Sequence, residues 1–146
     1  MKKLHFVLVL LISFIFIGSC SKEDKIRAVE FQSLSIAGAC PGSVLKSSTE
    51  KEKTIVITSE QMLSKEIGCL TSVPNVDFKT HFVLAGRAAF SKCAELEEDA
   101  IVEVGNILKY SVHIRQNECQ KMDTVYFMAA LPVRYKDHPI NFDISY

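Results

Sequence analysis

The second half of the chain is a succession of short β-type patterns, and this succession constrains the fold more than any other feature. Leu108 to Arg115 alternates apolar and polar side chains, and so do residues 140–146. Two other segments are apolar at odd and even positions alike, which is typical of strands covered on both faces; they are His81 to Phe90 and Thr124 to Leu131. With the short run Ala100 to Val104, the pattern predicts strands joined in sequence by short connections.

The first half adds further strands and one helix. Gln32 to Ala37 alternates, and Thr54 to Thr58 is a β-branched run. Ser59 is a good N-cap for a helix over Glu60 to Ile67, which Gly68 would end. The sequence therefore predicts a mainly β fold, in which an antiparallel sheet of about seven strands closes into a sandwich- or barrel-like domain with one short helix.

Gly105-Asn106 separates two of these strands and is a hairpin signal. A two-residue loop would place Glu103 opposite Leu108. Taking Ile107 into the loop would instead pair Val104 with Leu108. Because one face of such a hairpin is buried, we expect the second register, which keeps apolar side chains together.

The polar residues form no catalytic or ligand-binding motif. The acidic residues before the strand at 100 are expected to form a solvated loop, since they lack the spacing of a calcium loop; they are Glu95, Glu97, Glu98 and Asp99. The histidines that lie beyond the first twenty residues are expected at strand ends or on the surface; they are His81, His113 and His138. No nucleophile elbow, phosphate-binding loop or dinucleotide fingerprint occurs, so we expect no enzyme, no metal and no cofactor.

The chain begins with the three parts of a secretory signal. Lys2 and Lys3 supply a positive start, Phe6 to Ile17 is apolar except for Ser13, and small residues follow. A helix over this apolar run would span roughly 18 Å, which is less than the ~30 Å hydrocarbon core of a membrane. We therefore expect a cleaved signal peptide over residues 1–19 rather than a permanent transmembrane anchor.

Ile17-Gly18-Ser19-Cys20 resembles the lipobox of bacterial lipoproteins. The resemblance implies that Cys20 carries a lipid and that residues 20–25 are a polar tether to a single β-rich domain over residues 26–146. Lys22, Glu23 and Asp24 are similar to the export signal of surface-displayed lipoproteins in one Gram-negative lineage. That likeness implies an outer-membrane protein facing the cell surface. A plain tether and a periplasmic orientation are the alternatives.

A looser resemblance covers residues 54–146. A strand, the helical segment ITSEQMLSKEI, the VDF of residues 76–78, a long apolar strand and a closing hairpin look like small surface lipoproteins of Gram-negative gut-type anaerobes. This likeness implies a lipid-anchored envelope protein and supplies no catalytic residues.

With Cys20 assigned to lipid, an even number of cysteines remains, which in an exported domain favours disulfides. They are Cys40, Cys69, Cys93 and Cys119, and they allow three connectivities. If consecutive strands alternate in direction, the loops after Phe90 and Arg115 leave the same end of the sheet. We therefore predict the pairs Cys93–Cys119 and Cys40–Cys69.

Charge narrows the class of partner. The chain has 17 basic and 17 acidic residues, and the signal removes two lysines, which leaves a formal charge of −2 on the mature part. A near-neutral domain without a basic block is not expected to bind nucleic acid. We expect a binding or accessory module that is held to the membrane by its lipid and contacts an envelope protein or glycan, with Tyr135 exposed. The alternatives are a small envelope hydrolase and a protease-inhibitor-like module with a projecting loop.

Overall fold

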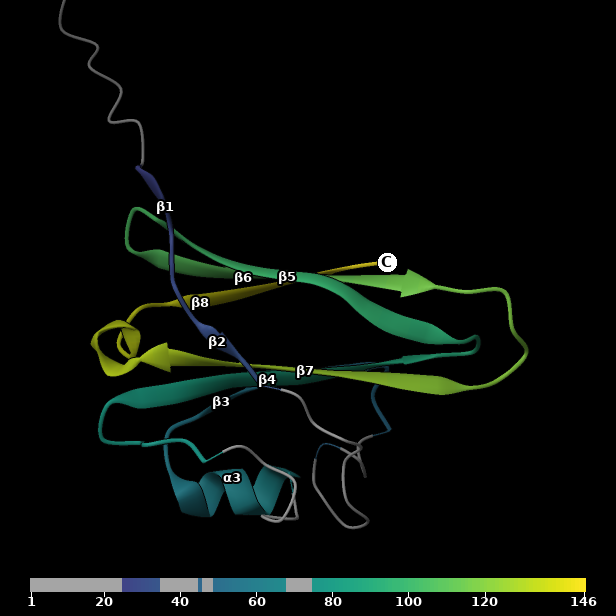
Figure 1. The fold of residues 1–146 in the computed structure, drawn as a ribbon, viewed down its shortest axis with the longest axis horizontal. Coiled ribbons are helices and arrows are strands. Elements are labelled where there is room, and N and C mark those ends of the chain that lie inside the picture. The colour runs from purple at the N-terminus through teal and green to yellow at the C-terminus, as the bar shows by residue number, and fades with distance from the viewer. Residues whose placement is uncertain (1–24, 35–44, 46–48, 68–74) are drawn as a thin grey trace, which may run out of the picture.

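The computed structural model describes residues 25–34, 45, 49–67 and 75–146. Within these residues, strands form two four-stranded sheets that face each other as a sandwich (Figure 1). The first sheet has the order β1 (Ile26–Ala28), β5 (Ala94–Val104), β6 (Ile107–Gln116) and β8 (Ile140–Ser145). The second has the order β2 (Gln32–Ser33), β7 (Asp123–Pro132), β4 (His81–Phe90) and β3 (Glu52–Ile57). The predicted mainly β, sandwich-like fold is confirmed.

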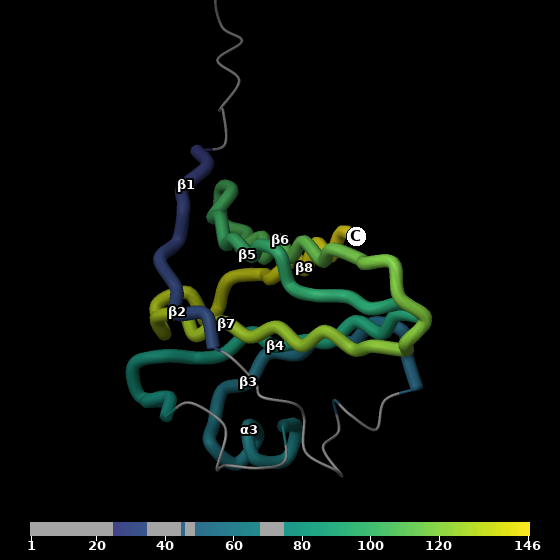
Figure 2. The backbone as a smooth tube through the Cα atoms, turned by 45° about the vertical axis from the view of Figure 1, so that its right-hand side comes forward, coloured from purple at the N-terminus to yellow at the C-terminus, as the bar shows by residue number. Residues whose placement is uncertain are grey.

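Helix α3 (Glu60–Ile67) lies on the face of the second sheet that points away from the first (Figure 2). It occupies the predicted residues. The backbone N–H of Met62 donates to Ser59 Oγ over 3.2 Å, so Ser59 caps the helix as its side-chain type predicts. Leu63 and Ile67 are buried against the second sheet, and this burial rather than helix propensity holds so short a helix in place.

The second sheet is covered on both faces, which explains the continuous apolar runs of β4 and β7. Phe82 and Leu84 face the first sheet, and Val83 and Ala85 face α3. Side chains on both faces of the second sheet are fully buried. Burying one such aliphatic or aromatic side chain contributes about 1.5–3 kcal/mol. The prediction that these two strands are covered on both faces is therefore confirmed.

The β5–β6 hairpin has the predicted Gly105-Asn106 loop but not the expected register. Val104 pairs with Ile107, and Glu103 with Leu108. Gly105 has a φ of 63°, as the first position of a two-residue type II′ turn requires. The expected register was wrong because Ile101, not the neighbouring valines, fills the buried position beside Tyr110.

Strand β5 begins at Ala94, so the expected acidic loop is part of a strand. Glu95 pairs with Arg115 across the hairpin, which compensates its charge, and Leu96 packs against the core. The register shifts between Leu96 and Glu98, a β-bulge that interrupts the alternation and conceals the strand in the sequence. The short strand expected over 100–104 is therefore eleven residues long.

Strand β8 runs parallel to β6, although an antiparallel neighbour was expected. After β7 the chain turns through the 3₁₀ helix η1 (Val133–Tyr135) and crosses to the first sheet. The backbone N–H of Leu108 donates to Pro139 O over 2.9 Å, so β8 enters the sheet at the same end as β6. The crossing between sheets thus makes the parallel pairing possible without a long connection.

Strand β1 was not predicted, and the strand expected over 32–37 is described only through Leu34.

Cys93 and Cys119 form the predicted disulfide, with Cα atoms 5.5 Å apart. Ala94 pairs with Gln116 in the first sheet, and Phe90 pairs with Asp123 in the second. The two connections that carry the cysteines therefore cross between the sheets at the same end of the sandwich, and the disulfide joins them. The predicted partners Cys40 and Cys69 lie outside the described residues, so that pairing stays a prediction.

Candidate functional site

The two long sides of the sandwich differ. On one side the chain passes from β1 in the first sheet to β2 in the second (Figure 1). The Val29 N–H donates to Ile101 O over 2.9 Å, and the Phe31 ring packs edge-on against Tyr110. This segment therefore bridges the two sheets. On the opposite side each sheet ends at an edge strand, β8 in the first sheet and β3 in the second.

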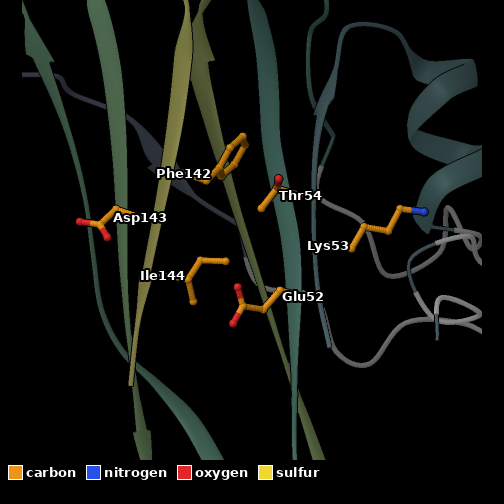
Figure 3. A pocket seen from close by; sticks show the side chains of 6 residues that line it. All are labelled: Glu52, Lys53, Thr54, Phe142, Asp143 and Ile144. Atoms are coloured by element: carbon orange, nitrogen blue, oxygen red, sulfur yellow. The ribbon is translucent and has the colours of Figure 1, made fainter. Parts of the chain in front are cut away.

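A hollow of about 440 Å³ lies between these edge strands, and we call it the edge groove. Its lining residues come from β3 and β8; they are Glu52, Lys53, Thr54, Phe142, Asp143 and Ile144. In Figure 3, Phe142 and Ile144 point from β8 toward β3, whereas Glu52 and Thr54 point from β3 toward β8. One wall of the edge groove is thus apolar and the other polar.

The direction of each side chain follows from strand alternation. Val56 faces the core between the sheets, so Thr54 and Glu52, two and four residues earlier, face the same way. Lys53 points toward α3, and Asp143 points away from the groove (Figure 3). Asp143 instead forms an ion pair with Lys109, whose Nζ lies 2.7 Å from Asp143 Oδ2 on the outer face of the first sheet.

A contact between residues just outside the two edge strands marks one end of the edge groove. The Lys51 ammonium donates a hydrogen bond to the Tyr146 hydroxyl and lies 4.3 Å from the centre of its ring. The hydrogen bond raises the pKa of Lys51 above its usual value. Tyr146 also packs edge-on against Phe90, with ring centres 5.3 Å apart. These contacts connect the end of β8 to the start of β3.

The edge groove can accommodate an extended chain. In the described part of the chain neither β3 nor β8 has a second strand neighbour, so each presents a row of backbone N–H and C=O groups at its outer edge. Phe142 and Ile144 are half-buried and offer apolar contact beside these groups. Strand edges beside apolar side chains are the arrangement that proteins use to bind a peptide by strand addition.

The histidines lie apart, each with its own polar neighbours. His81 Nδ1 lies 2.9 Å from Thr80 Oγ1 at the start of β4. His138 Nε2 lies 3.5 Å from Glu103 Oε1. Glu103 therefore has a polar partner at the sheet end where the hairpin register places it. Among the described residues, no group of three His, Cys, Asp or Glu side chains is arranged to hold a metal ion.

His113 lies between Ser145 and Glu97 on the outer face of the first sheet. Its Nδ1 is 3.0 Å from Ser145 Oγ, and its Nε2 is 3.3 Å from Glu97 Oε2. These residue types occur in serine hydrolases, but Ser145 Oγ also lies 3.5 Å from the carbonyl oxygen of Val112. The Ser145 hydroxyl has one proton, and the Val112 carbonyl competes with His113 to accept it. The arrangement is therefore better explained as a contact between neighbouring strands.

Tyr135 was expected to be exposed and is instead half-buried against the core. Its ring contacts His138 edge-on, with ring centres 5.5 Å apart, and Arg134 lies over it. The expectation was wrong because the turn after β7 folds back onto the end of the sandwich (Figure 1). Tyr135 is therefore held against the sandwich and does not project from the turn.

The residues of the predicted anchor lie outside the described part of the chain. They are Cys20, Lys22, Glu23 and Asp24. Among the residues that are described, no helix has the length and apolar character needed to cross a membrane.

The edge groove was not predicted from the sequence. A strand around Thr54 and a last strand with Phe142 and Ile144 on one face were predicted, so the two elements that line the groove were expected. That these strands lie opposite each other at the sandwich edge depends on the pairing of β8 with β6 and of β3 with β4. No local pattern in the sequence encodes these long-range pairings.

Comparisons of the chain with protein-family models, with curated proteins and with solved structures found no match.

Proposed function

We propose that this protein is a lipid-anchored binding or accessory module of the cell envelope, and that it recognises its partner in the edge groove. The observation that carries the proposal is the pair of strand edges that flank a hollow with apolar side chains on one wall. The partner is an extended segment of an envelope protein.

Three features of the edge groove support an extended peptide as the occupant. The strand edges supply hydrogen-bonding groups that match a peptide backbone of any sequence. Phe142 and Ile144 supply apolar contacts on every second residue, as a bound strand would require. Glu52 adds a carboxylate on the facing wall, which favours a basic side chain in the occupant.

The proposed location rests on the N-terminal residues. Cys20 carries the lipid, and the acyl chains hold the domain to the outer membrane. Lys22, Glu23 and Asp24 direct the domain to the cell surface in this proposal. A module held close to the membrane meets envelope partners at a high effective concentration, so modest affinity for a peptide segment is enough.

The proposal is tested by co-purification after crosslinking on intact cells. Thr54 is exposed and points into the edge groove, so Thr54→Arg fills the groove without disturbing the core. The matched control is Ala100→Arg, which adds the same side chain at an exposed position of β5 in the other sheet. We expect a stoichiometric partner with the wild type and the control, and its loss with Thr54→Arg.

Two results would contradict the proposal. Equal recovery of the partner with both variants would place recognition away from the edge groove. Recovery of a bound glycan instead of a protein would keep a binding function but replace the occupant.

A further inference from the structure

A second surface feature lies at the opposite edge of the first sheet. Apolar side chains gather on the outer face where the β5–β6 hairpin meets β1, and we call them the hairpin patch; they are Ile26, Ala28, Val102, Val104 and Ile107. Strand pairing places Ile26 beside Val104, and Val104 beside Ile107, in one lateral row. Ala28 pairs with Val102 in the next row.

The hairpin patch is not part of the core. Ile26 is 71% exposed and Ile107 is 48% exposed. Leu108, the residue after Ile107, is fully buried, so alternation directs Ile107 to the outer face. Large exposed apolar side chains that lie side by side mark a contact surface more often than isolated ones do.

The position of the hairpin patch relative to the anchor identifies its occupant. This step rests on the proposed lipid at Cys20. Ile26 follows Cys20 by six residues, and such a segment spans at most about 20 Å when fully extended. Ile26 therefore lies within that reach of the membrane surface. In Figures 1 and 2 the chain enters β1 at the hairpin end of the sandwich, the end at which the patch is located.

We propose that the hairpin patch docks on the membrane to which Cys20 is anchored and so orients the domain. The apolar row inserts at the boundary between headgroups and acyl chains, and the lipid at Cys20 keeps it there. Strands β1 and β8 are the opposite edges of the first sheet. The hairpin patch lies on the outer face of this sheet, whereas the edge groove lies between β8 and β3 of the two sheets, so docking leaves the groove open to a partner.

Tryptophan fluorescence tests this orientation, because the chain contains no tryptophan. The mature lipidated protein is reconstituted into phosphatidylethanolamine–phosphatidylglycerol vesicles whose acyl chains carry bromine, a contact quencher. Ile107→Trp places the probe in the hairpin patch, and Ile26→Trp is a second probe in case the first variant does not fold. The control is Met122→Trp, because Met122 is 84% exposed and precedes β7 at the disulfide end.

We expect brominated lipid to reduce the emission of Ile107→Trp to about half, as burial at the acyl boundary requires, and to leave Met122→Trp unchanged. If the protein sediments with vesicles but neither Ile107→Trp nor Ile26→Trp is quenched, or if Met122→Trp is quenched as strongly as they are, the docking is refuted while the anchor stands. If the protein does not sediment with vesicles, the anchor itself is refuted, and the orientation with it.

Discussion

Replacing Gly86 by alanine tests the packing between the two sheets. Gly86 lies in the middle of β4 and pairs with Phe127 of β7. A Cβ at this position would lie 2.4 Å from Phe127 Cζ and 2.9 Å from the carbonyl oxygen of Lys53. The phenyl ring thus occupies the space that a side chain at position 86 would need.

Phe127 cannot easily yield this space. It is only 1% exposed, and its ring contacts Tyr110 edge-on with centres 5.9 Å apart. Overpacking of this kind costs about 1–3 kcal/mol, and replacing a strand glycine by alanine recovers about 0.5–1 kcal/mol. We therefore expect Gly86→Ala to lower the free energy of unfolding by about 1.5 kcal/mol, or the melting temperature by roughly 5 °C.

Urea unfolding followed by circular dichroism measures the effect, and a double-mutant cycle with Phe127→Leu identifies its cause. Leucine shortens the side chain at the point of contact, so the double variant is expected to be at least about 1 kcal/mol more stable than the two single changes predict when added. A Gly86→Ala variant as stable as the wild type, or a coupling energy near zero, would refute the packing argument.

Three further changes have expected outcomes. Replacing Cys93 and Cys119 by serine removes a crosslink between residues with a sequence separation of 26. The chain-entropy relation then predicts that the free energy of unfolding, measured in urea, falls by about 3.5 kcal/mol. A fall below about 1 kcal/mol would mean that the crosslink barely restricts the unfolded chain. Burial, aided by the Asp99 carboxylate, raises the pKa of Tyr110 above its usual 10.0, so stability is expected to fall as the pH rises above 10. The decrease should reach at most about 1.4 kcal/mol per pH unit and be smaller in Tyr110→Phe; equal slopes would contradict it. Cys20→Ala is expected to leave the protein uncut or released from the membrane, as seen by palmitate labelling and fractionation, and a variant that is processed normally and retained at wild-type levels would disprove the lipid anchor.

Local patterns predicted the elements of this fold well. Alternation identified β6 and β8, continuous apolar character identified β4 and β7, and Ser59 marked the start of α3. These features depend on near neighbours in the chain, so the sequence displays them directly. The Cys93–Cys119 disulfide was also correct, because strand reversal brings both connections to the same end of the sandwich.

Features that depend on distant residues were not predicted. Ile101 and Val102 are similarly apolar, so the sequence alone did not indicate which of them faces the core. The bulge after Leu96 disguised the first half of β5 as a loop. The parallel pairing of β8, and with it the edge groove, follows from a crossing between sheets that no local pattern records.

Site-specific photo-crosslinking in living cells tests the edge groove most directly. A photoreactive residue at Thr54 points into the groove (Figure 3), whereas one at Ala100 lies at an exposed position of β5 in the other sheet. We predict that position 54 forms one discrete protein adduct and that position 100 forms none. Adducts of equal yield from both positions, or from position 100 alone, would contradict recognition in the edge groove.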